Sequence, residues 1–235
     1  MRAAVARDAD PTVQLAAAVT LAELFDGASG PSCAPVIMRA IDRQIQGAHG
    51  EDKIYFDFYG QTRDVGLVIY ALSLVGERGG APVREYFLRA LGDERAAVRA
   101  GATVGFYGRA WAAEPRAETA LWRLLRQDPS REVRYRTAMT LNSRRTSADS
   151  PQPGSTLAEQ EAASAAFFLR LLQAEPDANT RLAALDCLWH FQVTDQQLVQ
   201  LEASAERETD PLVREPLQGK IALEHRRRAD AAPAH

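Results

Sequence analysis

Apolar residues recur at three- and four-residue steps along most of the chain, the spacing that places side chains on one face of an α-helix. In the segment 179–188, for example, Leu182, Leu185 and Leu188 follow one another at three-residue steps. No segment alternates polar and apolar residues for long enough to predict a β-sheet. The pattern therefore predicts an all-α protein of eleven helices.

Several of these helices share a motif, which indicates internal repeats. Alignment on a Val-Arg step places Val98, Val133, Thr180 and Val213 at equivalent positions, with spacings of 35, 47 and 33 residues. The segments that carry the motif are DPTVQLAAAVTL from 10, AAVRAGATVG from 96, EVRYRTAMTL from 132, NTRLAALDCL from 179 and DPLVREPLQG from 210.

Three Asp-Pro pairs precede predicted helices and supply helix-start chemistry. The carboxylate can accept from free backbone N–H groups of the first turn, and proline follows where its missing N–H is harmless. The pairs begin at Asp10, Asp128 and Asp210. Each aspartate is therefore predicted to cap the helix that follows it.

The motif resembles the second helix of HEAT repeats, in the short bacterial form also seen in phycobilisome-lyase-type proteins. Residues 210–214 match Asp-Pro-x-Val-Arg directly, whereas Thr180 replaces the valine, Gln14 replaces the arginine and Pro216 interrupts the last unit. The resemblance implies one domain over 1–235, a right-handed α-α superhelix of about five antiparallel helix pairs plus an unpaired first helix. In such solenoids the second helix of each pair lines a concave surface that holds another macromolecule.

Three segments are expected to lie outside the helices: an aromatic connector at 47–63, a flexible insertion at 143–156 and a disordered tail at 229–235. The first helix lacks a preceding helix to cover it, so we expect a cap from the connector, a partner, or a second copy in a homodimer through the N-terminal end. The connector has two interpretations, a plug for that end or a partner-binding lip. Its aromatic residues are Tyr55, Phe56, Phe58 and Tyr59.

Charge is distributed unevenly, which favours an electrically bipolar molecule. Residues 94–145 hold eleven arginines and five acids, and residues 149–215 hold twelve acids and four arginines. In the HEAT-like interpretation the equivalent arginines Arg99, Arg134, Arg181 and Arg214 pair with acids of adjacent repeats. The surplus predicts a protein partner with an acidic patch, with nucleic acid as the weaker alternative. The candidate partner-binding residues are those four aromatic residues together with Arg95, Arg99, Arg131, Arg134, Tyr135 and Arg136.

Catalytic signatures are missing from the sequence. It contains no phosphate-binding glycine loop, nucleophile elbow or zinc motif, so no catalytic, cofactor or metal residue is assigned. We expect Trp111, Trp122 and Trp189 to pack in the core and His190 to be structural. With no signal peptide and no membrane-spanning run, a cytoplasmic protein is expected.

The expected function is a non-catalytic scaffold or adaptor that binds another protein through its concave surface and the aromatic connector. The alternatives are a HEAT-fold nucleic-acid enzyme resembling DNA glycosylases and a bilin-lyase-like protein.

Overall fold

The computed structural model describes residues 17, 33–39, 79–107, 111, 114–148 and 156–231 of the chain. All regular secondary structure within these ranges is helical, which confirms the all-α prediction. The chain divides into two compact units, Met1–Leu121 and Trp122–His235, and each is described by itself. The sequence had predicted one continuous domain.

The first unit contains a helix at 33–39 that buries Cys33, Ala34, Val36 and Ile37, followed by short helices that pack on one another. In this unit α5 packs on α6, and α6 on η3. The elements are α5 (Gly80–Ala90), α6 (Ala96–Thr103), η3 (Val104–Phe106) and the start of α7 (Pro115–Gln127), which continues into the second unit.

Close contact between two phenylalanines fixes the packing of η3 on α5. Phe87 and Phe106 are fully buried, and their rings meet edge to face with centroids 6.0 Å apart. A Cβ atom at Gly105 would fall well inside van der Waals contact of the Phe87 ring. Only glycine permits this approach without moving the ring.

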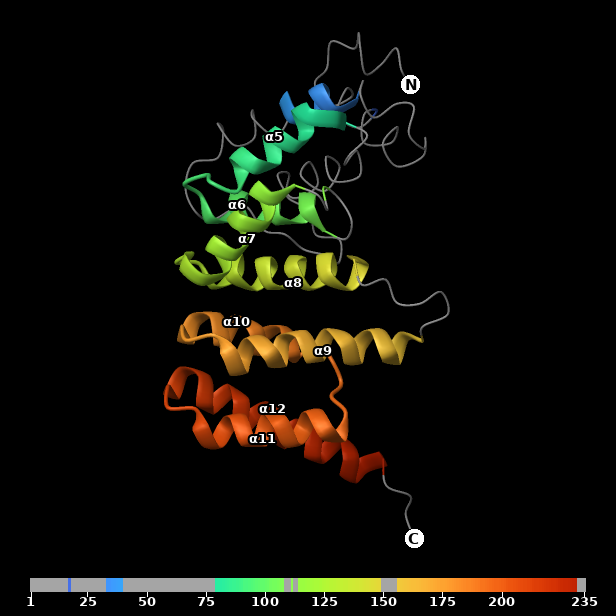
Figure 1. Ribbon diagram of the computed structural model, residues 1–235, viewed down its shortest axis with the longest axis vertical. Coiled ribbons are helices and arrows are strands. Elements are labelled where there is room, and N and C mark those ends of the chain that lie inside the picture. Colours follow the sequence, from blue (N-terminus) through green and yellow to red (C-terminus); the bar gives the residue numbers. More distant parts are fainter. Residues whose placement is uncertain are drawn as a thin grey trace. The chain divides into compact units, whose positions relative to one another are not determined.

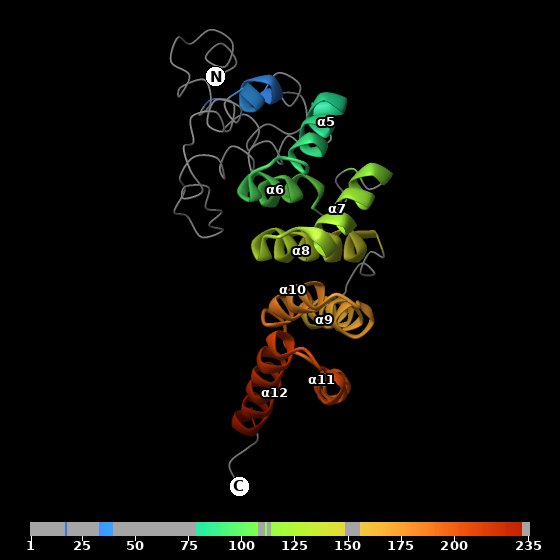
Figure 2. The same cartoon turned by 90° about the vertical axis from the view of Figure 1, so that its left-hand side faces the viewer.

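Helices of the second unit form two layers. There α10 packs on α8 and α12, α9 packs on α11, and each hairpin closes through α10 on α9 and α12 on α11. Figure 1 shows α9 beside α10 and α11 beside α12, and Figure 2 places α9 and α11 on one side with α10 and α12 on the other. The elements are α8 (Arg131–Ala148), α9 (Leu157–Ala174), α10 (Ala178–Leu188), α11 (Asp195–Arg207) and α12 (Pro211–Ala231).

The register of the repeats agrees with the sequence alignment. Val98, Val133, Thr180 and Val213 are all buried at the same position of their helices. Threonine is accommodated in place of valine because its Oγ1 lies 2.9 Å from Oδ2 of Asp177 and so has an acceptor. The repeat therefore tolerates a hydroxyl where the cap of the same helix can bind it.

The predicted helix caps are confirmed at one described position and displaced at another. Oδ1 of Asp210 accepts from the backbone N–H of Leu212 at 2.9 Å, as predicted. Asp128 instead accepts from the N–H of Ser130, and the Ser130 hydroxyl occupies the cap position of α8. Helices α9 and α11 begin with complete capping boxes that the sequence analysis had not assigned, Thr156 with Glu159 and Thr194 with Gln197.

Two predicted irregular segments are shorter in the structure. Helix α8 extends through 143–148, so the start of the predicted insertion is helical, and α12 includes 229–231 of the predicted tail. Residues 149–155 and 232–235 of these segments, the connector at 47–63 and nearly all of the first helix lie outside the described residues. Helix α12 also continues through Pro216, whose missing N–H deprives only the carbonyl of Leu212 in the exposed first turn.

Replacement of Gly105 by alanine should destabilise the first unit. We expect Gly105→Ala to cost about 1–3 kcal/mol, because the new methyl group must displace the buried Phe87 ring. Urea unfolding followed by circular dichroism measures the change. The control is Gly92→Ala, whose Cβ would meet only the carbonyl of Arg89 at 3.4 Å. Equal stabilities of the two variants would contradict the packing described.

The cap of α12 gives a second prediction. Asp210→Ala should lower the free energy of unfolding by about 1 kcal/mol, since the N–H of Leu212 loses its acceptor. Asp210→Asn keeps an acceptor oxygen and should retain most of the stability. The measurement is again urea unfolding, and an alanine variant as stable as the asparagine variant would show that the cap contributes nothing.

Candidate functional site

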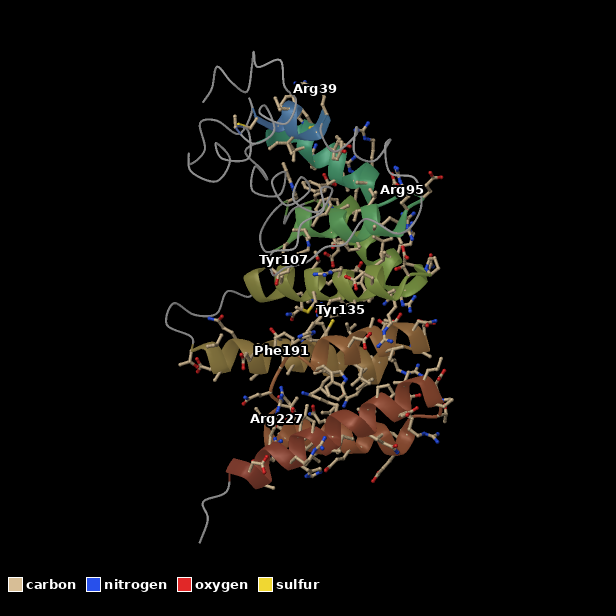
Figure 3. The ribbon with its side chains drawn as sticks, turned by 180° about the vertical axis from the view of Figure 1, so that it is seen from behind. Arg39, Arg95, Tyr107, Tyr135, Phe191 and Arg227 are labelled. Atoms are coloured by element: carbon tan, nitrogen blue, oxygen red, sulfur yellow. The ribbon has the colours of Figure 1, made fainter. Side chains whose placement is uncertain are left out.

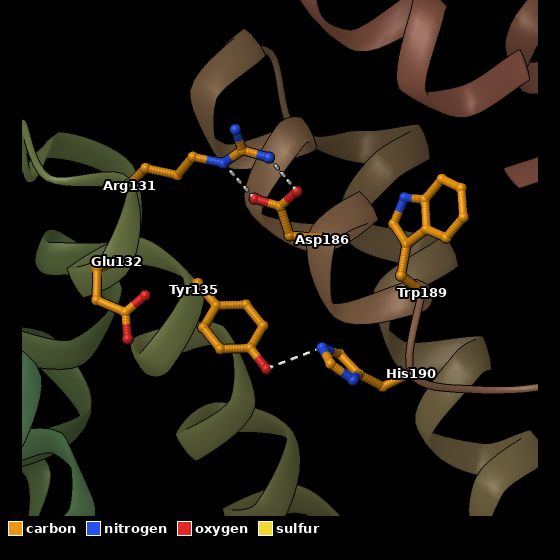
Figure 4. Close-up of a pocket in the computed structure, with 6 residues that line it drawn as sticks. All are labelled: Arg131, Glu132, Tyr135, Asp186, Trp189 and His190. Carbon is orange, nitrogen blue, oxygen red and sulfur yellow. Dashed lines mark hydrogen bonds and ion pairs between the residues drawn. The ribbon is translucent and has the colours of Figure 1, made fainter. Parts of the chain in front are cut away.

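An open depression of about 660 Å³ lies on the layer formed by the second helices of the second unit. Its residues come from the first turns of α8 and from the end of α10, two helices that pack on each other. Figure 4 shows Arg131 meeting Asp186 and Tyr135 meeting His190, with Glu132 and Trp189 at the two ends of the site. The lining residues are Arg131, Glu132, Tyr135, Asp186, Trp189 and His190.

Helical spacing brings each group of three residues together. On α8, Arg131 and Glu132 lie four and three residues before Tyr135, and on α10 Asp186 lies three residues before Trp189. Residues three or four apart are neighbours on a helix surface. The depression therefore lies between one cluster on α8 and a second cluster at the end of α10 and in the turn after it.

A bidentate ion pair joins the two helices. Nε of Arg131 donates to Oδ2 of Asp186 at 2.7 Å, and Nη2 donates to Oδ1 at 2.5 Å. The hydrogen bond to Asp186 raises the pKa of Arg131. Because the arginine side chain is 61% exposed, the pair contributes little stability but holds the guanidinium and the carboxylate in one geometry.

Tyr135 of α8 and His190, in the turn after α10, contact each other across the depression. Oη of Tyr135 lies 3.1 Å from Nε2 of His190, and their ring centroids are 5.8 Å apart. Tyr135 lies between α8 and α10 in Figure 3, and its burial raises the pKa of its hydroxyl. Arg136 covers the tyrosine ring at 5.7 Å and donates to Oε1 of Glu132 at 2.6 Å.

Trp189 is the large hydrophobic side chain that is exposed at this site, with 39% of its surface accessible. The ammonium of buried Lys220 lies 6.0 Å from its ring and donates to the carbonyl of Phe191 and to Oε1 of Glu224. Burial lowers the pKa of Lys220. Burial acts to raise the pKa of Glu224, but Lys220 and neighbouring arginines outweigh it and keep that pKa below its usual value. This network ties the turn after α10 to α12.

The equivalent arginines of the repeats bind backbone carbonyls. Each guanidinium donates to the carbonyls five and six residues before it, at 2.6 to 3.3 Å. The accepting residues are Asp93 and Glu94 for Arg99, Asp128 and Pro129 for Arg134, Glu175 and Pro176 for Arg181, and Glu208 and Thr209 for Arg214. We call this set the arginine ladder.

Pairing with a carboxylate of an adjacent repeat, which the sequence analysis expected throughout the ladder, is seen among the described residues for Arg181. Arg181 donates from Nε and Nη2 to both oxygens of Glu208, each at 2.9 Å. Arg134 reaches the next repeat through the amide oxygen of Asn179 instead. The main role of the ladder is therefore to satisfy the loop that precedes each second helix.

The sequence contains a regular spacing that corresponds to this arrangement. An acid stands six residues before each ladder arginine, and its carboxylate receives donors of its own. The four acids are Asp93, Asp128, Glu175 and Glu208.

Several of the described arginines within 94–145 pair with carboxylates elsewhere in the chain. Arg126 donates to both oxygens of Glu175, and Arg131 does the same to Asp186, so both pairs join the arginine-rich segment to the acidic one. Arg116 pairs with Glu85 and lowers the pKa of Glu114 to about 2. Part of the uneven charge distribution predicted from the sequence is therefore used in ion pairs between neighbouring helices.

The predicted site residues separate into three groups. Arg131 and Tyr135 line the depression and Arg136 adjoins it, whereas Arg134 is buried under the loop before α8. The other two arginines are in the first unit, where Arg95 pairs with Asp93 and Arg99 belongs to the ladder. The connector aromatics Tyr55, Phe56, Phe58 and Tyr59 lie outside the described residues.

Sequence reasoning missed four residues of the site. Glu132, Asp186, Trp189 and His190 were not selected, and the expectation that Trp189 packs in the core is wrong at its exposed side. Contacts such as Tyr135 with His190 span 55 residues. Without knowledge of how α8 packs on α10, no local spacing indicates them.

Within the parts of the chain that the structure describes, no group of three or more His, Cys, Asp or Glu side chains could hold a metal ion. Cys187 lies beneath Tyr135, and burial raises the pKa of its thiol, which disfavours the nucleophilic thiolate. None of the described helices combines the length and apolarity needed to cross a bilayer.

The ion pair of Arg181 with Glu208 should make stability depend on pH. The hydrogen bond from Arg181 lowers the pKa of Glu208 in the folded protein, so its stabilisation is present above the ordinary value and is lost as pH falls through the folded one. Glu208→Gln should therefore lose less stability between pH 7 and pH 3 than the unsubstituted protein. Urea unfolding at both pH values tests this. Glu206→Gln, at an exposed position two residues earlier, is the control, and equal pH dependence of the two variants would contradict the assignment.

No model of a known protein family, no curated protein and no solved structure matches this chain. The likeness to HEAT repeats therefore stays a prediction that rests on the motif residues. Function has to be argued from the depression between α8 and α10 and from the side chains that line it.

Proposed function

We propose that this chain is a non-catalytic scaffold that holds another protein against the depression between α8 and α10. The observation that carries the proposal is the exposed indole of Trp189, which lines the depression together with Tyr135 and charged side chains. Tryptophan, tyrosine and arginine are the residues that most often dominate binding energy at protein interfaces. The site lies on the second-helix layer, the surface that HEAT-like proteins use for partners.

The site is also held in place before a partner arrives. The Arg131–Asp186 pair fixes the charged rim, and the contacts of buried Lys220 hold the turn that carries Trp189. A surface whose side chains are already ordered loses less entropy on association. The ordered side chains therefore favour the interpretation that the exposed indole binds a partner.

Arginine usage favours a protein over a nucleic acid. Phosphate binding needs guanidinium donors that are available to the ligand. The ladder arginines spend donors on loop carbonyls, and Arg131 spends two on Asp186. The arginines thus give less support to an acidic partner than their number in the sequence suggested, and the aromatic side chains carry the proposal.

Site-specific crosslinking tests the proposal. A photoreactive phenylalanine analogue at His190, which is exposed in the depression, should form covalent adducts with a discrete protein in cells of the source organism. The matched control is the same analogue at Val199, exposed on α11 in the other layer. Adducts at 190 that disappear in a Trp189→Ala background are the expected result.

Absence of adducts at 190, or equal yields at 190 and 199, would overturn the scaffold proposal. A gel-shift with duplex DNA and a visible absorbance band after co-expression with bilin address the two alternatives. Saturable DNA binding that weakens with salt, or a bound bilin chromophore, would replace the scaffold by the corresponding class.

A further inference from the structure

Half of the residues that line the depression carry rings: Tyr135, Trp189 and His190. We call these three side chains the ring cluster. The rings of Tyr135 and His190 have centroids 5.8 Å apart, and Trp189 directly precedes His190 in the chain. Figure 4 shows Tyr135 on one helix and the other two side chains on the facing segment. The ring cluster therefore offers ring surface from both sides of the depression.

The charged residues of the lining are already neutralised within the chain. Asp186 accepts from Arg131 through both of its oxygens, and Glu132 accepts from Arg136. Glu132 also lies at the opposite end of the depression from Trp189 (Figure 4). A charged ligand at the ring cluster would give up hydration without gaining a free counter-charge. The pairing therefore favours an uncharged ligand.

Hydrogen-bond donors remain at the ring cluster. The Nε1–H group of Trp189 is a donor, and none of the described residues accepts from it. Tyr135 and a neutral His190 carry two polar hydrogens between them, and their contact at 3.1 Å uses one. Whichever tautomer His190 adopts, one O–H or N–H group stays available. A ligand that supplies acceptors therefore complements these side chains.

We propose that the ring cluster binds an uncharged, proline-rich segment of the partner protein in the polyproline II conformation. This inference rests on the scaffold function proposed above and specifies its ligand. Proline-rich segments dock in grooves that are lined by aromatic side chains. Their carbonyl groups are acceptors, and each proline lacks the backbone N–H that would otherwise need a partner. Such a segment therefore satisfies the donors of the ring cluster and brings no charge.

Other peptide conformations suit the depression less well. An amphipathic helix docks through apolar anchors spread over two helical turns, whereas half of the residues lining the depression are charged. A β-strand would need a free sheet edge, and the regular secondary structure within the described ranges is helical. A polyproline II segment is extended before it binds, so it loses less conformational entropy on association.

Peptide binding tests the inference directly. Four capped, fluorescently labelled peptides share the same Gly-Ser flanks and differ in a central block: six prolines, six alanines, alternating Arg-Ala or alternating Glu-Ala. Anisotropy titrations with the full chain measure their affinities. We expect the proline peptide to bind roughly tenfold more tightly than the alanine peptide, because its rings pack on the ring cluster and its conformation is preformed. Both charged peptides should bind more weakly than the proline peptide.

Variants assign the binding to the ring cluster. Trp189→Phe keeps a ring but removes the indole N–H, and should weaken the proline peptide by roughly threefold. The control Trp122→Phe makes the same change on α7, outside the depression, and should leave the affinity unchanged. Circular dichroism checks the fold of each variant.

An exposed residue gives an independent second variant. His190→Ala removes a ring from the cluster and should weaken the proline peptide by roughly threefold. Its control is His225→Ala, at an exposed position of α12 where the imidazole contacts Glu202 instead. His225→Ala should bind the proline peptide as the unsubstituted protein does.

Three outcomes would overturn the inference: equal binding of the proline and alanine peptides, tighter binding of a charged peptide, or affinities of both cluster variants equal to those of their controls. Any of these, combined with adducts from the crosslinker at 190, would leave the scaffold function standing with a different ligand. A failure of the crosslinking experiment would remove the scaffold function itself.

Discussion

The structure depends on how each second helix is joined to the loop before it. A loop between helices exposes carbonyl groups that have no helical partner, and in four repeats an arginine in the first turn reaches back to bind two of them. The residue before that arginine is buried in every case, so one dipeptide fixes both the packing and the loop. The Val-Arg step repeats because this local geometry repeats.

Carboxylates extend the same constraint along the second unit. Glu175 and Glu208 lie in successive loops, accept from a ladder arginine through their carbonyls, and accept from an arginine of another helix through their side chains. Each of these glutamates therefore links its loop both to the helix that follows it and to a second helix. The pair of Arg126 with Glu175 joins the arginine-rich part of the sequence to the acidic part, so these parts supply less free surface charge than a count suggests.

Sequence alone predicted what depends on local chemistry. The all-helical class, the buried register at Val98, Val133, Thr180 and Val213, and the cap at Asp210 follow from residues close in the chain. The depression could not be predicted, because Tyr135 and His190 meet across 55 residues through the packing of α8 on α10. Trp189 was misplaced for a related reason: apolar spacing identifies a helix face, but only the neighbouring helices decide how much of it stays exposed.

Lys220 connects the depression to the last helix, α12. Its ammonium belongs to α12, yet it binds the carbonyl of Phe191, two residues after Trp189. The last hairpin is therefore more than a polar end cap, since the turn that carries the indole is anchored to it. A shortened chain that stopped just before α11 would keep every residue lining the depression and still lose the ammonium that anchors the turn carrying Trp189.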